Sequence, residues 1–260
     1  MRELHWTQTV TDVQPNRVML RGYPIDELMG KCTFPEIVYL ALKGELPAAP
    51  ITELIDAILV SSIDHGATPP STLAARTAAS TGAPLNAALA SGILSINKYH
   101  GGAIEDAMRT FLHIQAFAND EGLSLEESVE QVLSNFRVEN KRVMGFGHRI
   151  HSDDPRQRRL FSLAEESGVA GDFVTIAELV AAELKRQIGK PLPINVDGAI
   201  AAILCDLEFP PELANAFFII ARVPGLVAHI HEEQSAHNPM RKIHPTDHEY
   251  SGPEERHINE

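Results

Sequence analysis

The stretch Val-Met-Gly-Phe-Gly-His-Arg-Ile-His-Ser-Asp-Asp-Pro-Arg, residues 143–156, combines a permissive backbone with imidazole, guanidinium and carboxylate groups. Gly145 and Gly147 allow a positive φ or a close approach to a ligand. Pro155 keeps the residue before it extended and suits the first turn of a following helix. Such a loop is suited to chemistry on an anion. A glycine-rich turn with a surface histidine would show the same pattern, so this stretch alone does not establish a functional site.

On both sides of this stretch the sequence has the periodicity of α-helices. Apolar residues recur at spacings of three and four between a possible N-cap at Thr33 and a stop at Gly44. Ser124 and Glu127 have the spacing of a capping box. The expected helices cover residues 34–42, 51–61, 71–81, 84–97, a long stretch from 104, 124–136, 157–167, 172–188, 196–207, 211–221 and 224–235.

Almost no segment alternates polar and apolar residues, apart from a possible short hairpin or irregular entry in residues 1–24. The sequence therefore predicts an all-α fold, followed from about residue 238 by a polar tail that carries His244, His248 and His257. A chain of 260 residues with 44% apolar content is long enough to bury a sizeable core.

The charge balance limits the partners that the chain can bind. Lys and Arg number 22 against 35 Asp and Glu, a formal net charge of -13, which argues against nucleic acid and anionic membranes. Cys32 and Cys205 lie too far apart to suggest a disulfide framework. The N-terminus lacks an apolar signal segment, and we expect no apolar run to reach the ~18 residues of a membrane span. These features predict a cytoplasmic protein.

Four titratable residues stand beside glycine at helix breaks or starts, where side chains meet ligands. They are His65, His100, His148 and Asp197. Asp197 could instead be a carboxylate that caps a helix N-terminus.

Other kinds of site find little support in the sequence. His229 and His231 lie two apart, which points them in different directions on a helix, and the His-Glu-x-x-His spacing of a zinc protease is absent. The chain has no P-loop, no third glycine for a dinucleotide fold and no Gly-x-Ser-x-Gly elbow. We therefore expect no metal, and a site built from His, Asp and Arg.

Along most of the chain lie, in this order, the motifs Arg21-Gly-Tyr-Pro-Ile25, the segment 34–47, Asp64-His65, His100-Gly-Gly-Ala103, Gly145-Phe-Gly-His-Arg149, Asp154-Pro-Arg156 and Asn195-Val-Asp197. Taken together, these motifs and their order resemble the citrate synthase superfamily. Within it the chain is similar to the small citryl-CoA lyase-like branch, including the citryl-CoA lyase module of ATP-citrate lyase. His100 departs from that module, which lacks it, and is kept by true synthases.

The resemblance implies a role for each matching residue. The chemistry it implies needs a carboxylate base that removes a proton from the methyl group of an acyl-CoA, and a donor at the thioester oxygen. A coenzyme A thioester is then a substrate, and no cofactor is permanently bound. The implied catalytic residues are His100 (donor), His148 and Asp197 (base); the implied substrate-binding residues are His65, Arg156, Arg222 and, lent by a partner subunit, Arg241; and Gly145, Phe146, Gly147 and Arg149 are implied to bind coenzyme A.

The resemblance also implies a fold. Residues 1–260 would form one compact citrate synthase-like multi-helical unit, with a large helical part at about 1–135 and 196–260 and a smaller part at about 136–195. Two such chains would form an intertwined homodimer.

The activity that the resemblance implies is cleavage of citryl-CoA to acetyl-CoA and oxaloacetate, with a possible partner enzyme that supplies citryl-CoA. The alternative is a citrate or 2-methylcitrate synthase, which also hydrolyses the thioester. Hydrolysis needs tight closure around an activated water, and the short segments between the motifs favour the lyase. A third interpretation is a non-catalytic subunit that binds coenzyme A or a dicarboxylate.

Overall fold

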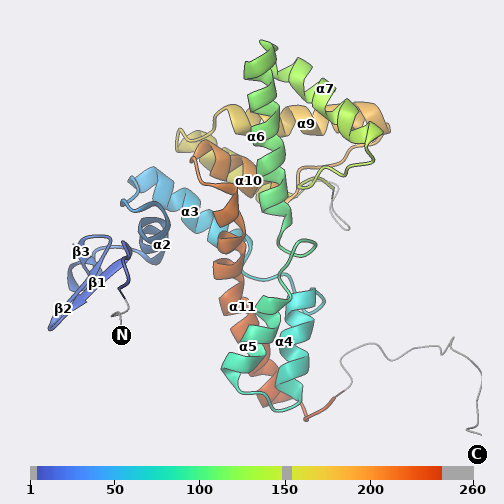
Figure 1. Ribbon diagram of the computed structural model, residues 1–260. Helices are drawn as coiled ribbons and strands as arrows, with labels where there is room; N and C mark the ends of the chain where they lie inside the picture. The colour runs from blue at the N-terminus through green and yellow to red at the C-terminus, as the bar shows by residue number, and fades with distance from the viewer. Residues whose placement is uncertain (1–4, 148–153, 242–260) are drawn as a thin grey trace, which may run out of the picture. The chain divides into compact units, whose positions relative to one another are not determined.

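The chain is mostly helical in the computed structural model, which describes residues 5–147 and 154–241 (Figure 1). The predicted all-α class is confirmed, with one small sheet at the N-terminus. The elements are β1 Thr11–Gln14, β2 Arg17–Leu20, β3 Tyr23–Pro24, α1 Ile25–Leu28, α2 Phe34–Lys43, α3 Ala49–Ser61, α4 Pro70–Ser80, α5 Leu85–Leu94, α6 Ala103–Glu121, α7 Leu125–Val138, α8 Pro155–Glu166, α9 Asp172–Ile188, α10 Val196–Asp206, the 3-10 turn η1 Pro211–Leu213 and α11 Ala214–Ala236.

The N-terminal sheet is the short hairpin that the sequence allowed. β1 pairs antiparallel with β2, and β2 with β3, so the strand order is β1-β2-β3. The first turn places Asn16 at φ 59°, a backbone region in which asparagine is enriched. Arg21 follows β2 and donates through Nε (3.2 Å) and Nη2 (2.8 Å) to the carbonyl of Ala41 in α2. This side chain fastens the sheet to the last turns of α2, because those carbonyls have no helical partner.

The predicted N-cap at Thr33 and the predicted capping box at Ser124 are both confirmed, and Thr33 also forms a capping box with Glu36. At α2 the Thr33 amide donates to Glu36 over 2.6 Å, and the helix ends at Gly44 with φ 94°. At α7 the Ser124 hydroxyl accepts from the Glu127 amide, and the Glu127 carboxylate accepts from the Ser124 amide.

Two predicted helix boundaries are wrong. The expected helix 84–97 ends at Leu94, because Asn97 and His100 exchange backbone hydrogen bonds of 2.8 Å in a tight turn. The expected pair 211–221 and 224–235 is one helix, α11, which continues through Pro224. Proline removes one helical hydrogen bond there. Buried side chains on both sides of it, including Phe217 and Leu226, favour continuing the helix.

Residues Pro211–Ala236 are long and apolar enough to cross a membrane by length and composition. Our expectation that no apolar run reaches this length is therefore wrong for this segment. A core helix of a soluble protein has the same properties, and 39% of the apolar window is buried inside the chain.

The contacts between residues divide the chain into two compact units. The first comprises Met1–His65 and Ile96–Gly225, and the second comprises Gly66–Ser95 and Leu226–Glu260. The predicted division into a large and a smaller helical part stays a prediction.

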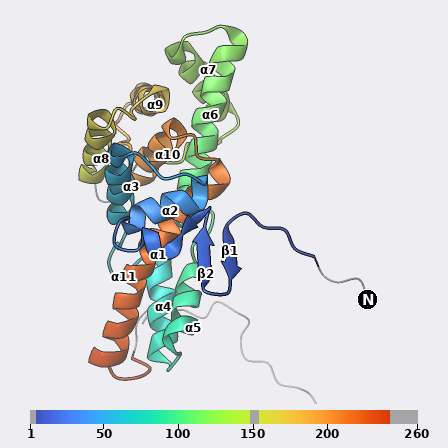
Figure 2. The same cartoon turned by 90° about the vertical axis from the view of Figure 1, so that its left-hand side faces the viewer.

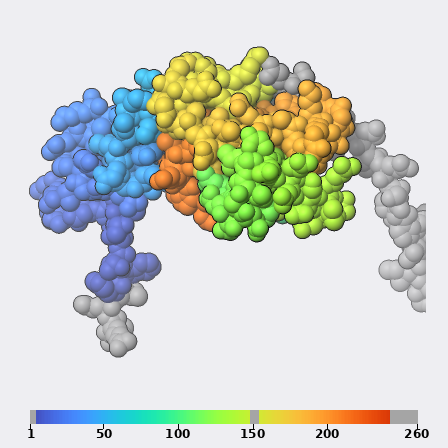
Figure 3. Space-filling view, turned by 90° about the horizontal axis from the view of Figure 1, so that it is seen from above, coloured from blue at the N-terminus to red at the C-terminus, as the bar shows by residue number. Residues whose placement is uncertain are grey.

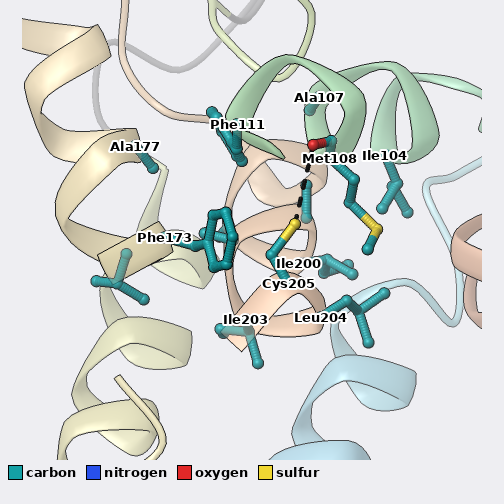
Figure 4. Close-up of a cluster of buried hydrophobic side chains, with 14 of the residues drawn as sticks. Ile104, Ala107, Met108, Phe111, Phe173, Ala177, Ile200, Ile203, Leu204 and Cys205 are labelled. Atoms are coloured by element: carbon teal, nitrogen blue, oxygen red, sulfur yellow. Dashed lines mark hydrogen bonds between the residues drawn. The ribbon is translucent and has the colours of Figure 1, made fainter. Parts of the chain in front are cut away.

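The core of the first unit is centred on α10, which packs against α6, α8 and α9 (Figure 2). On the surface of this unit, Figure 3 shows the yellow-to-orange residues of α8 and α9 beside the green residues of α6 and α7. Residues 199–204 of α10 are completely buried, so this helix is apolar on every side. Figure 4 shows Ile200 and Ile203 among side chains of α6 and α9, including Phe111 and Phe173, with the Cys205 thiol facing the Met108 carbonyl at 3.9 Å. Such enclosure holds α10 in one position and fixes the residues at its ends.

In the second unit, small residues bring α4 and α5 together. A Cβ added at Gly92 would lie 3.0 Å from the carbonyl of Ser71 and 3.1 Å from the Cβ of Ala75.

The part of α11 in this unit carries Glu233, a buried carboxylate that accepts hydrogen bonds from Arg76 (2.9 Å) and Arg241 (2.6 Å).

Asp206, at the C-terminal end of α10, caps the neighbouring helix α9. Its carboxylate accepts hydrogen bonds of 3.0–3.1 Å from the amides of Gly171, Phe173 and Val174. These amides belong to the start of α9 and have no partner within the helix, so Asp206 satisfies them and complements the helix dipole.

Replacing Asp206 with alanine should lower the free energy of unfolding by about 1–3 kcal/mol, because three amides lose their acceptor. Chemical denaturation followed by circular dichroism measures this. The matched control is Asp56→Ala, which removes an exposed carboxylate of α3. Equal stability of the two variants would contradict the assigned role of Asp206.

Candidate active site

Two backbone segments of the first unit meet at the predicted site without side chains between them. The Gly147 amide donates to the Pro193 carbonyl (2.7 Å), and the Asn195 amide donates to the Gly145 carbonyl (3.0 Å). A Cβ added at Gly198 would lie only 2.3 Å from the Gly145 oxygen. Glycine at 198 therefore lets the segment ending at Gly147 lie directly against the start of α10.

Asp197 lies in the first turn of α10, but it does not cap that helix. The N-cap is Asn195, whose side-chain oxygen accepts from the amides of Asp197 (3.0 Å) and Gly198 (3.1 Å). Its side-chain amide donates to the Gly147 carbonyl at 3.0 Å. The alternative interpretation of Asp197 as the capping carboxylate is therefore wrong.

The carboxyl group of Asp197 has an unusual pKa. Burial raises the pKa of Asp197 from its ordinary value of 3.8 to about 6. The positive charges of Arg156 and Arg222 oppose this rise, and the negative charge of Asp154 adds to it. A carboxyl group with a pKa near 6 can both accept and donate a proton near neutral pH.

Arg156 is held in place by Asp154 at the start of α8. Asp154 is completely buried and caps the helix by accepting from the Arg156 amide at 3.0 Å. The same carboxylate accepts from Nε (3.0 Å) and Nη2 (2.8 Å) of the Arg156 side chain. This two-point contact fixes the plane of the guanidinium group.

Arg222, in α11, is the buried cation of the site. Only 3% of the residue is exposed, its Nε donates to the Ser62 carbonyl at 3.0 Å, and its Cζ lies 4.6 Å from the centre of the Phe218 ring. Its buried Nη1 has no hydrogen-bond partner. Burial lowers the pKa of Arg222, and the charges of Asp64 and Asp197 oppose this. A buried guanidinium nitrogen without a partner is costly, and an anionic ligand would satisfy it.

His100 lies in the turn that precedes α6. Gly101 follows it with φ 85°, and a Cβ there would lie 2.8 Å from Phe218. Burial lowers the pKa of His100, and Arg222 and His65 lower it further. The imidazole is therefore neutral at pH 7 and can donate a hydrogen bond without carrying a charge.

Phe218 is a site residue that the sequence reasoning missed. The centres of the Phe218 and His100 rings lie 5.7 Å apart in an edge-to-face arrangement. The Arg222 guanidinium lies over the face of the Phe218 ring. The spacing of four residues between Phe218 and Arg222 on one helix is a signal that could have identified it.

The structure brings several predicted residues together in the first unit. Arg156 and Arg222 lie close enough to act on the charge of Asp197, and Arg222 and His65 act on that of His100. Their catalytic and binding roles stay predictions.

Other predicted residues stand apart from this group. The Phe146 ring is buried against Phe111, with ring centres 6.2 Å apart, so it belongs to the core. Arg241 belongs to the second unit, where it pairs with Glu233. His148 and Arg149 lie outside the described residues. Within the described ranges, no three His, Cys, Asp or Glu side chains are grouped to hold a metal ion.

The site thus combines a carboxyl group that can exchange a proton, a neutral donor and two guanidinium groups. Such a set can remove or return a proton beside a carbonyl group while it holds carboxylates.

Known proteins share this fold. The structure of citryl-CoA lyase from Hydrogenobacter thermophilus is 40% identical, with a TM-score of 0.88 over 98% of this chain and 97% of that one. ATP citrate lyase from Methanosaeta concilii, solved with (3S)-citryl-CoA, has the same fold at 24% identity, with a TM-score of 0.83 over 98% of this chain and 43% of that one.

A curated relative, citrate synthase from Haloferax volcanii, is 32% identical over 203 residues, which cover 77% of this chain and 51% of the relative. The chain spans about half the length of the curated relatives it matches. Residues 48–246 match the family described as citrate synthase, C-terminal domain. Because this match covers most of the sequence and includes all but the first two of the motifs given above, the chain belongs to the citrate synthase family.

Proposed function

We propose that the chain cleaves citryl-CoA to acetyl-CoA and oxaloacetate. The observation that carries this proposal is Asp197, whose carboxyl pKa of about 6 suits proton exchange with carbon beside a thioester. The similarity to citryl-CoA lyase from Hydrogenobacter thermophilus over nearly the whole length of both chains supports the lyase in particular.

The proposed reaction proceeds as a retro-aldol cleavage. A base takes the proton from the tertiary hydroxyl of the citryl group, and family resemblance assigns this base to His148. The hydroxyl oxygen becomes the keto group of oxaloacetate as the adjacent carbon-carbon bond breaks. The electron pair of that bond passes to the thioester, which becomes an enolate. His100 donates a hydrogen bond to the enolate oxygen, and protonated Asp197 gives its proton to the enolate carbon, which yields acetyl-CoA.

The guanidinium groups would hold the carboxylates of the substrate. Arg222 supplies the buried Nη1 that has no partner, and Arg156 supplies a guanidinium of fixed orientation. His65, which is exposed in the loop between α3 and α4, would add a third contact. These local cations would allow an anion to bind to a protein with a net charge of -13.

The second candidate is a citrate or 2-methylcitrate synthase, which forms the same carbon-carbon bond and then hydrolyses the thioester. Two observations favour it: the similarity to citrate synthase from Haloferax volcanii and the presence of His100. A non-catalytic subunit that binds coenzyme A or a dicarboxylate is the third, and it would have no need for the proton-exchanging carboxyl group of Asp197.

We further propose that the chain works in the cytoplasm as a homodimer, with Arg241 and the 145–149 loop contributing to the substrate sites. Cys32 and Cys205 are both free thiols, which fits a reducing compartment. A partner enzyme that makes citryl-CoA would complete the pathway, and the ATP citrate lyase similarity suggests this arrangement.

Incubating the purified chain with citryl-CoA should release oxaloacetate, followed through malate dehydrogenase, without a matching release of free thiol. Free thiol together with citrate would establish the synthase instead. Binding of citryl-CoA with neither product would establish the non-catalytic subunit.

The protonation of Asp197 should set the pH dependence of cleavage. Cleavage needs Asp197 protonated, so kcat/KM for citryl-CoA should fall about tenfold per pH unit above the Asp197 pKa of about 6. A kcat/KM for cleavage that stays constant as the pH rises through this value would contradict Asp197 as the proton-exchanging group.

Replacing Asp197 with asparagine should slow both directions by a factor of about 10²–10⁴, because the proton donor and acceptor is lost. The raised pKa means that folding opposes ionisation of Asp197, so its stability penalty develops as the pH rises from the ordinary pKa of 3.8 to about 6 and is complete above that value. The variant should therefore be more stable at pH 8 by about 1–3 kcal/mol. Rates and denaturation midpoints, with exposed Asp56→Asn as the unchanged control, measure both effects.

A further inference from the structure

The buried carboxylate of Asp154 caps α8 and takes no part in the reaction proposed above. No part of it is exposed to solvent, yet it accepts three hydrogen bonds from one residue, Arg156. One of these goes to the backbone amide and is sufficient to cap the helix. The other two go to the side chain, so the carboxylate does more than a cap requires.

The two side-chain contacts determine what Arg156 can offer a ligand. Nε and Nη2 face Asp154 at 3.0 and 2.8 Å, which directs the Nη1 edge of the guanidinium group away from the carboxylate. The Arg156 side chain is 25% exposed, so it stays within reach of a ligand. Because its orientation is already fixed, it loses little conformational freedom when it binds a carboxylate.

Asp154 also acts on Asp197 through its charge. Among the described residues, the charged groups that face Asp197 are Arg156 and Asp154 of α8 and Arg222 of α11. The arginines favour the ionised form of Asp197, and Asp154 favours the protonated form. Asp154 therefore offsets part of the effect of the arginine that it holds.

We propose that Asp154 is a positioning residue that aims Arg156 at a substrate carboxylate. This inference rests on the proposed function, because the carboxylate that Arg156 would meet is one of those of citryl-CoA. It adds a residue that the proposed mechanism does not use.

The first test is Asp154→Asn, which keeps an oxygen that can cap α8 and removes the charge. The variant should lose about tenfold in kcat/KM for citryl-CoA, mainly through a higher KM, because Arg156 is no longer held by a charged partner. The pH above which kcat/KM falls should also shift downward, since the pKa of Asp197 loses a contribution that raises it.

Ser124→Ala is the matched control for a purely structural role. Ser124 caps α7 in the same unit, and its loss should lower the melting temperature without moving the pH profile. If Asp154→Asn likewise only lowers the melting temperature and keeps the wild-type KM and pH profile, the proposal is wrong.

If Asp154→Asn fails to fold, the double variant Asp154→Asn/Arg156→Gln tests the same proposal by comparison with Arg156→Gln alone. Removing both partners of a buried ion pair destabilises less than removing one. Arg156→Gln alone should move the pH profile upward, because Asp154 then acts on Asp197 without its arginine. Adding Asp154→Asn to Arg156→Gln should move the pH profile of kcat/KM back down. A double variant with the same pH profile as Arg156→Gln alone would overturn the proposal. A wild-type chain without any cleavage would instead refute the proposed function, so the two failures are distinct.

Discussion

The close approach of Gly145 to Gly198 is the contact on which the rest of the site depends. A single carbon at position 198 would overlap the Gly145 oxygen at 2.3 Å, so the two backbones lie together only because neither residue has a side chain. Hydrogen bonds from Gly147 and Asn195 then hold the two segments in register. The result places the start of α10, and with it Asp197, directly against the loop that continues toward His148. A small steric constraint thus determines where Asp197 lies.

Around this contact the charges oppose one another. Burial alone would keep Asp197 protonated, two arginines favour its ionised form, and Asp154 limits their effect. The balance leaves a carboxyl group that changes state near neutral pH. Arg222 illustrates the cost of such a site, because a buried guanidinium with an unsatisfied nitrogen destabilises the chain until an anion binds. These features are unfavourable for folding alone and are characteristic of sites that bind and react.

The sequence predicted the parts of the structure that depend on local chemistry. The caps at Thr33 and Ser124 follow from neighbouring residues, and both helices begin directly after these predicted caps. The continuation of α11 through Pro224 escaped prediction, because buried contacts on both sides of the proline outweigh its local preference. Family resemblance supplied the candidate residues, whereas the contact of Phe218 with His100 depends on the fold, which brings these distant segments together.

Helix α10 carries a carboxyl group with a different role at each of its two ends. Its first turn carries Asp197, and its last residue, Asp206, holds the start of α9 by three amides. A helix of 11 residues is about 16 Å long and behaves as a stiff rod in a fully packed core. A substitution that displaces the start of α9 would therefore have to displace the whole of α10, and Asp197 with it. The start of α9 and Asp197 thus share one rigid support, although they lie at opposite ends of α10.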